Sequence, residues 1–201
     1  MSSEDTYKTI KEPGFGEFKD RGSKFLAFAY PVQTEKEIKE LLGELKKKHH
    51  SARHHCYAFR IGAEEFYYRT NDDGEPSGTA GKPIYGQILS FDLTNILIVV
   101  VRYFGGTLLG TSGLINAYRS AAKVCLEHAT VVDQVINENI TIKFQYASMN
   151  SVMRIIKEES AEILSQDFSD TCTISLGIPK SKAEKCMAKF HVLSDVQVVP
   201  G

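Results

Sequence analysis

The chain has 201 residues, of which 42% are hydrophobic and 24% charged, a composition typical of a globular protein with a substantial core. Its 24 lysines and arginines nearly balance 25 aspartates and glutamates, which excludes binding through a strongly basic domain, so any nucleic-acid contact must be local. No apolar run reaches the ~18 residues that span a bilayer, and the polar N-terminus lacks the pattern of a signal peptide, so we expect a cytoplasmic protein.

The first part of the chain predicts a mixed sheet with helices packed on it. Thr34 and Glu37 are spaced as a capping box ahead of a helix, and the wholly apolar run from Ile96 to Val101 predicts a buried strand. The predicted strands are residues 24–32, 56–61, 66–70 and 96–103, and the predicted helices follow Thr34, cover residues 82–91 and begin after residue 113.

Two polar, glycine-rich segments interrupt this pattern. Residues 72–83 hold too many turn-forming residues for a core element, and residues 102–113 lead from the buried strand into a long amphipathic helix. A glycine-rich turn before a helix gathers backbone N–H donors, and we expect Thr111 or Ser112 to be the N-cap. Residues 105–113 are therefore interpreted either as an anion or RNA-backbone site or as a structural turn.

Acidic side chains in the first of these segments allow a metal interpretation. Asp72, Asp73 and Glu75 could supply oxygen ligands to Mg²⁺ beside a phosphate. Such a stretch is more often a turn whose side chains accept hydrogen bonds from their own backbone, and we favour this second interpretation. We expect no metal ion and no organic cofactor.

Four histidines lie within seven residues and are followed by a cysteine: His49, His50, His54, His55 and Cys56. His54 and His55 point to opposite faces of a strand, so one metal site could use His54 with Cys56, or His55, but not all of them. We favour a surface tract with one buried histidine. The lysines at 46–48 end a helix, where cations suit the helix dipole, and we interpret them as a solvated helix end.

Cysteine spacing excludes two further classes of site. No Cys-x-x-Cys pair occurs, so neither a zinc ribbon nor a thioredoxin-type site is predicted, and we expect reduced, mostly buried thiols. The cysteines are Cys56, Cys125, Cys172 and Cys186.

The chain after residue 137 predicts a separate domain in the order βαββαβ, which is the ferredoxin-like plan. Ile140, Ile142 and Phe144 alternate as a strand, and a helix, a hairpin, a second helix and a final strand follow. Ser181 and Glu184 are spaced as a capping box for the second helix. We therefore predict an α+β protein with domains at residues 1–132 and 137–201.

Four motifs occur in a fixed order along the chain: GSKFLA at residues 22–27, ARHHCYAF at 52–59, DDGEPSGTAGKP at 72–83 and VRYFGG at 101–106, followed by Leu109-Gly110. Together they resemble the IMPACT family in its bacterial form, and the resemblance covers nearly the whole chain. It implies an N-terminal sheet with helices like the second domain of a small-subunit ribosomal protein and domain IV of elongation factor G. The C-terminal part then resembles the ferredoxin-like domain V of that factor.

The chain departs from the common family pattern at the start of the long helix. Where many members read GGLVRAY, residues 112–118 read SGLINAY, so one glycine and one arginine are missing. Lys82, Arg102 and Arg119 are then the candidate cations beside the two glycine-rich segments.

Eukaryotic relatives in this family are translation regulators that act by binding a partner of a starvation-responsive kinase. The resemblance implies a translation-associated protein that contacts RNA, the ribosome or a protein partner through residues 72–83 and 102–113. The two loops offer places to bind but no evident base or nucleophile, so we name no catalytic residue. We expect Lys82 and Arg102 to contribute more to binding than the lysines at 46–48. The candidate binding residues are Asp72, Asp73, Glu75, Lys82, Arg102, Tyr103, Gly105, Gly106, Gly110, Thr111, Ser112, Gly113 and Arg119.

Two enzyme classes are alternatives. A phosphate- or nucleotide-ligand enzyme could use the glycine-rich loop, as small-molecule kinases place such a loop before a helix, although neither a Lys-Ser/Thr phosphate motif nor an evident catalytic base follows here. A hydrolase could use His54 and Cys56 with an aspartate, which requires the nucleophile and its base to touch in space.

Overall fold

A computed structural model describes residues 5–169 and 171–200 of the chain. They form two units, one comprising Tyr7–Gln134 and the other comprising Asp5 and Thr6 together with the described residues from Val135 onward. Each unit has its own sheet, its own helices and its own buried core. The α+β fold class predicted from the sequence is confirmed. No helix in the described part of the chain is long and apolar enough to cross a membrane.

The larger unit is built on a five-stranded antiparallel sheet with the strand order β2-β3-β6-β4-β5. The strands are β2 (Gly14–Asp20), β3 (Ser23–Pro31), β4 (His54–Ile61), β5 (Tyr67–Asn71) and β6 (Ile96–Tyr103). The apolar run from Ile96 to Val101 occupies the central strand and is completely buried, because helices cover the sheet on both sides.

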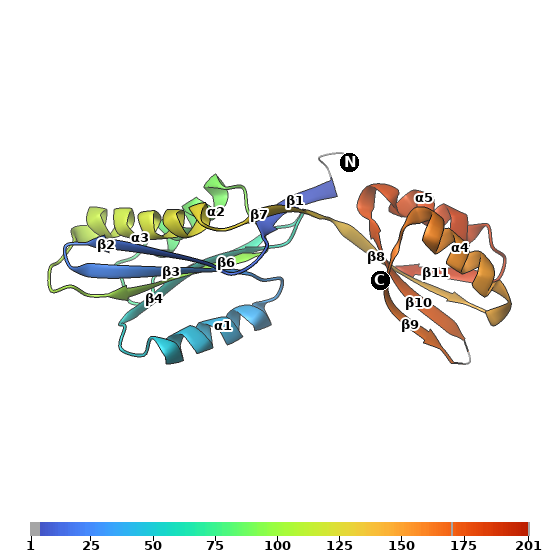
Figure 1. The fold of residues 1–201 in the computed structure, drawn as a ribbon, viewed down its shortest axis with the longest axis horizontal. Helices are drawn as coiled ribbons and strands as arrows, with labels where there is room; N and C mark the ends of the chain where they lie inside the picture. Colours follow the sequence, from blue (N-terminus) through green and yellow to red (C-terminus); the bar gives the residue numbers. More distant parts are fainter. Residues whose placement is uncertain (1–4, 170, 201) are drawn as a thin grey trace. The chain divides into compact units, whose positions relative to one another are not determined.

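Figure 1 shows how these helices are divided between the two faces. α2 (Gly81–Ser90) and α3 (Gly110–Glu127) lie on one face, and α1 (Glu35–Lys48) lies on the other. Because side chains alternate along a strand, Val100 of β6 packs in the core beneath α2 and α3, whereas Val99 and Val101 pack in the core beneath α1. The same alternation directs Arg102 to the α3 side and Tyr103 to the α1 side.

The predicted capping box at the start of α1 is confirmed. The Thr34 hydroxyl oxygen accepts a hydrogen bond from the Glu37 N–H at 3.3 Å, and the Glu37 carboxylate accepts one from the Thr34 N–H at 3.3 Å. Two N–H groups at the helix start are thereby satisfied, and the helix can bury Ile38 and Leu45 against the sheet.

Three strands of this part of the chain are not anticipated by the sequence patterns. They are β1 (Thr6–Ile10), β2 and β7 (Val131–Val135). β1 and β7 pair with each other as a two-stranded sheet. The sequence predicts only a short connection over residues 132–137, because Asp133 and Gln134 make β7 too polar for a core strand.

The smaller unit has a four-stranded antiparallel sheet in the order β11-β8-β10-β9, with two helices packed on one face (Figure 1). The chain order is β8 (Asn137–Phe144), a short 3-10 helix η2 (Tyr146–Ser148), α4 (Met149–Glu159), β9 (Glu162–Phe168), β10 (Cys172–Pro179), α5 (Lys180–His191) and β11 (Val196–Pro200). Ile140, Ile142 and Phe144 are buried and pair with β10, so the predicted βαββαβ order is the one observed.

The predicted capping box at Ser181 and Glu184 is wrong. α5 begins two residues earlier than this box requires, at Lys180, with Pro179 in the N-cap position and no side-chain hydrogen bond at the cap. Pro179 also ends β10, so the chain passes from strand to helix without the intervening residue that a serine cap requires.

Candidate functional site

The two glycine-rich segments meet at a buried ion pair. Arg102 Nη1 donates to Glu75 Oε1 at 2.7 Å, and the Tyr118 hydroxyl of α3 donates to the same oxygen at 2.7 Å. The side chains of Arg102 and Glu75 are only 7% and 4% exposed. Glu75 lies between β5 and α2, and Arg102 lies near the end of β6, so this contact brings residues 72–83 and 102–113 together.

Asp72 organises the first segment from within. Its carboxylate accepts hydrogen bonds from the N–H groups of Gly78 at 2.8 Å, Ala80 at 3.0 Å and Gly81 at 2.8 Å. Burial acts to raise the pKa of Asp72, but these three backbone donors outweigh it and lower the pKa below its ordinary value. The carboxylate is therefore engaged in holding the turn and the start of α2, as in the hydrogen-bonded interpretation favoured above.

Replacing Asp72 by Asn is expected to destabilise the larger unit at neutral pH by about 1–3 kcal/mol, because a neutral amide replaces a charged acceptor of three N–H groups. The folded-state pKa is lowered, so this contribution is complete above pH 3.8, the ordinary value, and is lost as the pH falls through the lower folded value. Urea unfolding of both proteins over a pH series should show the difference shrinking below pH 3.8. A difference in the free energy of unfolding that does not change with pH would contradict this role. An equal loss of stability from Asp133→Asn, on exposed β7, would contradict it as well.

Asp73 fastens the same segment to the neighbouring strand and helix. Its Oδ2 accepts a hydrogen bond from the His55 N–H at 2.7 Å, and Lys46 Nζ lies 3.6 Å from its Oδ1. The His54 ring nitrogen Nδ1 lies 2.8 Å from the Asp73 carbonyl oxygen. The acidic segment is thus held by β4 and by the end of α1 as well as by its own turn.

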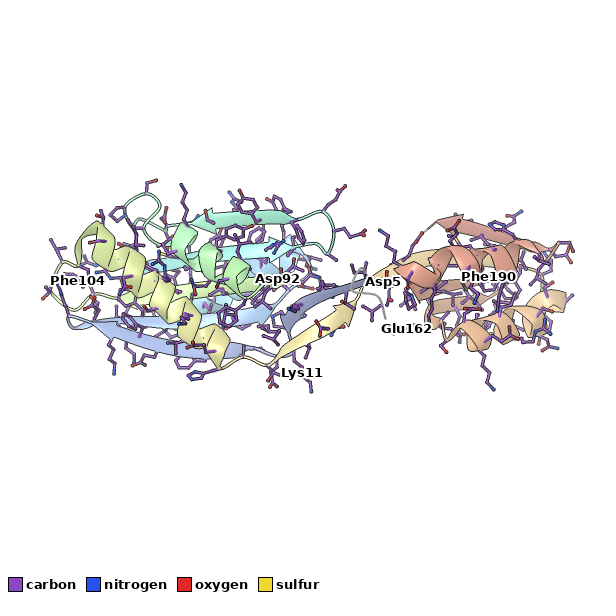
Figure 2. All side chains as sticks on the ribbon, turned by 90° about the horizontal axis from the view of Figure 1, so that it is seen from above. Asp5, Lys11, Asp92, Phe104, Glu162 and Phe190 are labelled. Atoms are coloured by element: carbon purple, nitrogen blue, oxygen red, sulfur yellow. The ribbon has the colours of Figure 1, made fainter. Side chains whose placement is uncertain are left out.

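A pocket of about 440 Å³ opens beside the start of α3. Figure 2 shows Phe104, one of its lining residues, at the end of the sheet where α3 begins. The pocket is lined by Arg53, His54, Glu75, Pro76, Arg102, Phe104, Leu108, Leu109, Gly110, Thr111 and Leu114. Of the predicted binding residues, Glu75, Arg102, Gly110 and Thr111 therefore share one cavity.

The start of α3 differs from the sequence prediction. The helix begins at Gly110, with Leu109 in the N-cap position and no side-chain hydrogen bond at the cap, so neither Thr111 nor Ser112 is the N-cap. Both lie in the first helical turn, directly after Gly110, whose positive φ of 71° is a conformation that glycine adopts without strain. The N-terminus of this 18-residue helix therefore lies at the pocket, and its cap makes no side-chain hydrogen bond within residues 5–169 and 171–200.

Close packing against the backbone requires a glycine at position 105. Its N–H donates to the buried Ser23 hydroxyl at 3.2 Å, and a Cβ at this position would overlap the backbone of Gly22 and Ser23. Gly105 thus joins the end of β6 to the turn between β2 and β3. Gly106 follows in the exposed connection to α3, and Gly113 lies in the first turns of α3; neither lines the pocket.

Three other predicted binding residues also lie outside the pocket. Tyr103 faces α1, where its hydroxyl lies 2.9 Å from His49 Nδ1. Lys82 is exposed in the first turn of α2. Arg119 is exposed on α3, eight residues after Thr111 and therefore on the same side of the helix.

Several pocket residues were not among the predicted binding residues. Arg53 is one of them, and its exposed side chain lies on the pocket rim. His54 pairs directly across the sheet with Arg102, a register that no pattern within either strand reveals. Phe104 and Leu108 are 48% and 81% exposed, and apolar side chains within a polar, glycine-rich segment were the signal that could have identified them.

The sulfur of Cys56 lies beneath the site. It is 3.0 Å from the Asp72 carbonyl oxygen and 3.3 Å from the Tyr118 hydroxyl. Burial raises the pKa of the Cys56 thiol and that of the Tyr118 hydroxyl well above their ordinary values. Both groups remain protonated near neutral pH and serve the hydrogen-bond network of Glu75.

His49 and His55 lie on the α1 side of the sheet, away from the pocket. His55 is buried on the α1 side, where burial lowers its pKa, and His49 beside Tyr103 has its pKa lowered for the same reason. The expected separation of His54 and His55 to opposite faces of the strand is observed.

Comparisons with known proteins agree with the motifs. A family model described as the Impact N-terminal domain matches residues 21–126. The chain is 36% identical over 153 residues to the IMPACT family member YvyE of Bacillus subtilis (strain 168), covering 76% of this chain and 70% of that protein. A crystal structure described as that of a hypothetical protein matches with a TM-score of 0.76 at 26% identity and covers 98% of both chains. The two-domain translational regulator Yih1 is a weaker structural match, with a TM-score of 0.39 at 30% identity, covering 61% of this chain and 47% of that one.

Proposed function

The chain belongs to the IMPACT family, and from this premise we propose that it is a translation-associated protein that binds single-stranded RNA and catalyses no reaction. The observation that carries the proposal is the meeting of residues 72–83 and 102–113 at the Glu75–Arg102 ion pair, beside the pocket at the start of α3. This arrangement places helix N–H donors, cationic side chains and exposed apolar side chains on one surface.

Charge on this surface supports an RNA contact of modest strength. Arg102 is neutralised by Glu75, so the exposed cations available for phosphate are Arg53 on the pocket rim, Lys82 on α2 and Arg119 on α3. The protein as a whole has a net charge of −1, so binding depends on these few local contacts. This also changes the role expected of Arg102, whose burial makes it a structural anchor of the site.

The chemistry beneath the pocket supports binding without catalysis. A nucleophilic cysteine requires a lowered pKa, whereas burial raises that of Cys56. The Tyr118 hydroxyl is committed to Glu75, and its pKa is also raised by burial. These two groups are suited to hold Glu75 in place, which favours a binding function over the hydrolase alternative.

Binding of a fluorescently labelled single-stranded RNA should fall with salt along a log–log slope of about −2, the value for three phosphate contacts. Replacing Arg53, Lys82 and Arg119 together by Ala should weaken binding and flatten the slope toward zero, as measured by fluorescence anisotropy at several salt concentrations. The matched control replaces Lys39, Lys47 and Lys48, which are exposed on α1 at the opposite face of the sheet.

The control triple variant is expected to bind like the wild type, since it loses the same charge from a different face. Equal losses from both triple variants would contradict the site assignment, because they would indicate a response to net charge alone. Capture of ribosomal material from a lysate that disappears after ribonuclease treatment would agree with an RNA contact. Capture of a translation protein that survives ribonuclease would instead favour a protein partner.

A further inference from the structure

The pocket beside α3 has an apolar wall that is open to solvent. Phe104 is 48% exposed and Leu108 is 81% exposed, and Pro76 also lines the cavity. Large apolar side chains gathered at one cavity of a soluble domain are typical of a ligand surface. A volume of about 440 Å³ is sufficient for a small organic molecule but not for a folded segment.

The floor of the same pocket is polar and its hydrogen-bonding capacity is incompletely used. Arg102 is more than nine-tenths buried, and its Nε has no partner among residues 5–169 and 171–200. Glu75 Oε1 accepts from both Arg102 and Tyr118, whereas no donor to its Oε2 is found in the same residues. An apolar ligand would leave both groups without partners, so the floor favours a ligand that carries both donors and acceptors.

The rim of the pocket suits an anion. Gly110 and Thr111, the first two residues of α3, line it, and no side chain in the described part of the chain caps that helix start. Arg53 contributes an exposed guanidinium to the same rim. A helix N-terminus together with an arginine is a common setting for a phosphate group.

We propose that this pocket holds one unpaired nucleotide of the bound RNA, an inference that rests on the proposed RNA-binding function. The base lies against Phe104 and Leu108, with its edge toward Glu75 and Arg102. The phosphate lies at the first turn of α3. A nucleotide fits all three walls, because every base has an apolar π face and an edge with donors and acceptors, and its phosphate is an anion.

The direct test compares probes that carry the base, the phosphate or both. The full-length protein labelled with ¹⁵N is titrated with adenosine 5′-monophosphate, ribose 5-phosphate and adenosine, and amide shifts are followed by NMR. The nucleotide should bind about tenfold more tightly than ribose 5-phosphate, because only it can stack on the apolar wall. It should also bind more tightly than adenosine, with shifts at Gly110 and Thr111 that adenosine does not produce.

The apolar wall has a matched control in the same unit. Phe104 and Phe66 are both 48% exposed, and each lies near an arginine, with the Arg102 Cζ 5.6 Å and the Arg60 Cζ 3.6 Å from the respective ring centre. Phe104→Ala should weaken the affinity for adenosine 5′-monophosphate about tenfold, and Phe66→Ala should leave it unchanged.

The proposed phosphate position at the first turn of α3 is tested by introducing a negative charge that does not destabilise the helix. Thr111→Glu places a carboxylate in the first turn of α3, where it suits the helix dipole but repels a phosphate. It should abolish the advantage of the nucleotide over adenosine. Asn116→Glu carries the same charge on an exposed position of the same helix and should keep that advantage.

Failure of this inference can be told apart from failure of the proposed function. If single-stranded RNA binds but adenosine 5′-monophosphate binds no better than ribose 5-phosphate, the pocket does not hold a base and the RNA contact lies elsewhere on the surface. Equal effects of Phe104→Ala and Phe66→Ala would overturn the inference in the same way. If neither RNA nor the nucleotide binds, both the inference and the proposed function are wrong.

Discussion

Gly105→Ala should destabilise the larger unit by about 3 kcal/mol or more, because the new methyl group has no space and its neighbours are main-chain atoms that cannot rotate away. A Cβ at this position would overlap the backbone of Gly22 and Ser23, and the hydrogen bond from the Gly105 N–H to the Ser23 hydroxyl would be lost as the segments separate. Urea unfolding followed by tyrosine fluorescence reports this unit, since Tyr146 is the single tyrosine of the chain outside residues 7–134.

The control for this variant is the same substitution where space is available. Gly43 lies in α1, and a Cβ there would meet nothing within 4 Å. Gly43→Ala should therefore stabilise the unit by up to about 1 kcal/mol through higher helix propensity. If Gly105→Ala is also neutral or stabilising, the close approach between β6 and the β2–β3 turn is not a constraint on the fold.

The sequence predicts those elements whose residues repeat with a clear period. β6 is predicted over its observed range, Ile96–Tyr103, because a short apolar run followed by a glycine-rich turn is typical of a strand buried on both faces. α1 is predicted from its capping box, and β8 from the alternation of Ile140, Ile142 and Phe144. In each case the local pattern and the burial imposed by the fold agree.

The missed strands are those in which tertiary contacts override the local pattern. β2 contains Gly14 and Gly16, and glycines at these positions interrupt the pattern from which a strand is predicted. In the structure Gly16 lets β2 approach the α3 backbone at Cys125, where a Cβ would be too close. This function of a glycine depends on a helix more than 100 residues away in the sequence and has no local signal.

The candidate site shows the same division between local and distant information. Glu75 and Arg102 were selected because a charged residue within a glycine-rich loop indicates a binding function. Each of them could be chosen from its own segment, without knowledge of the other segment. Arg53 and His54 enter the pocket through the pairing of β4 with β6, and Tyr118 through the packing of α3 over Cys56. Strand register and helix placement supply these three residues, and neither can be deduced from spacing alone.

Breaking the buried ion pair should have the largest effect of any single change in the site. Arg102→Met is expected to destabilise the larger unit by about 3–5 kcal/mol, because it leaves the Glu75 carboxylate buried with the Tyr118 hydroxyl as a neutral donor and with His54 Nε2 4.0 Å from its Oε1. Glu75→Gln should cost about 1–3 kcal/mol, since the amide can still accept a hydrogen bond from Arg102. Both variants can be measured by urea unfolding with tyrosine fluorescence.

The double variant distinguishes an ion pair from two independent contributions. Arg102→Met with Glu75→Gln removes both charges, so its destabilisation should be smaller than the sum of the single effects by about 1 kcal/mol or more. The exposed pair Lys123–Glu127, with its charged atoms 3.6 Å apart on α3, should give a coupling of at most about 0.5 kcal/mol when treated in the same way. Additive losses at Arg102 and Glu75 would mean that the two glycine-rich segments are held together by other contacts. A strong coupling would mean that this one pair sets the pocket floor, so that the proposed RNA binding and the folding of the unit depend on the same two side chains.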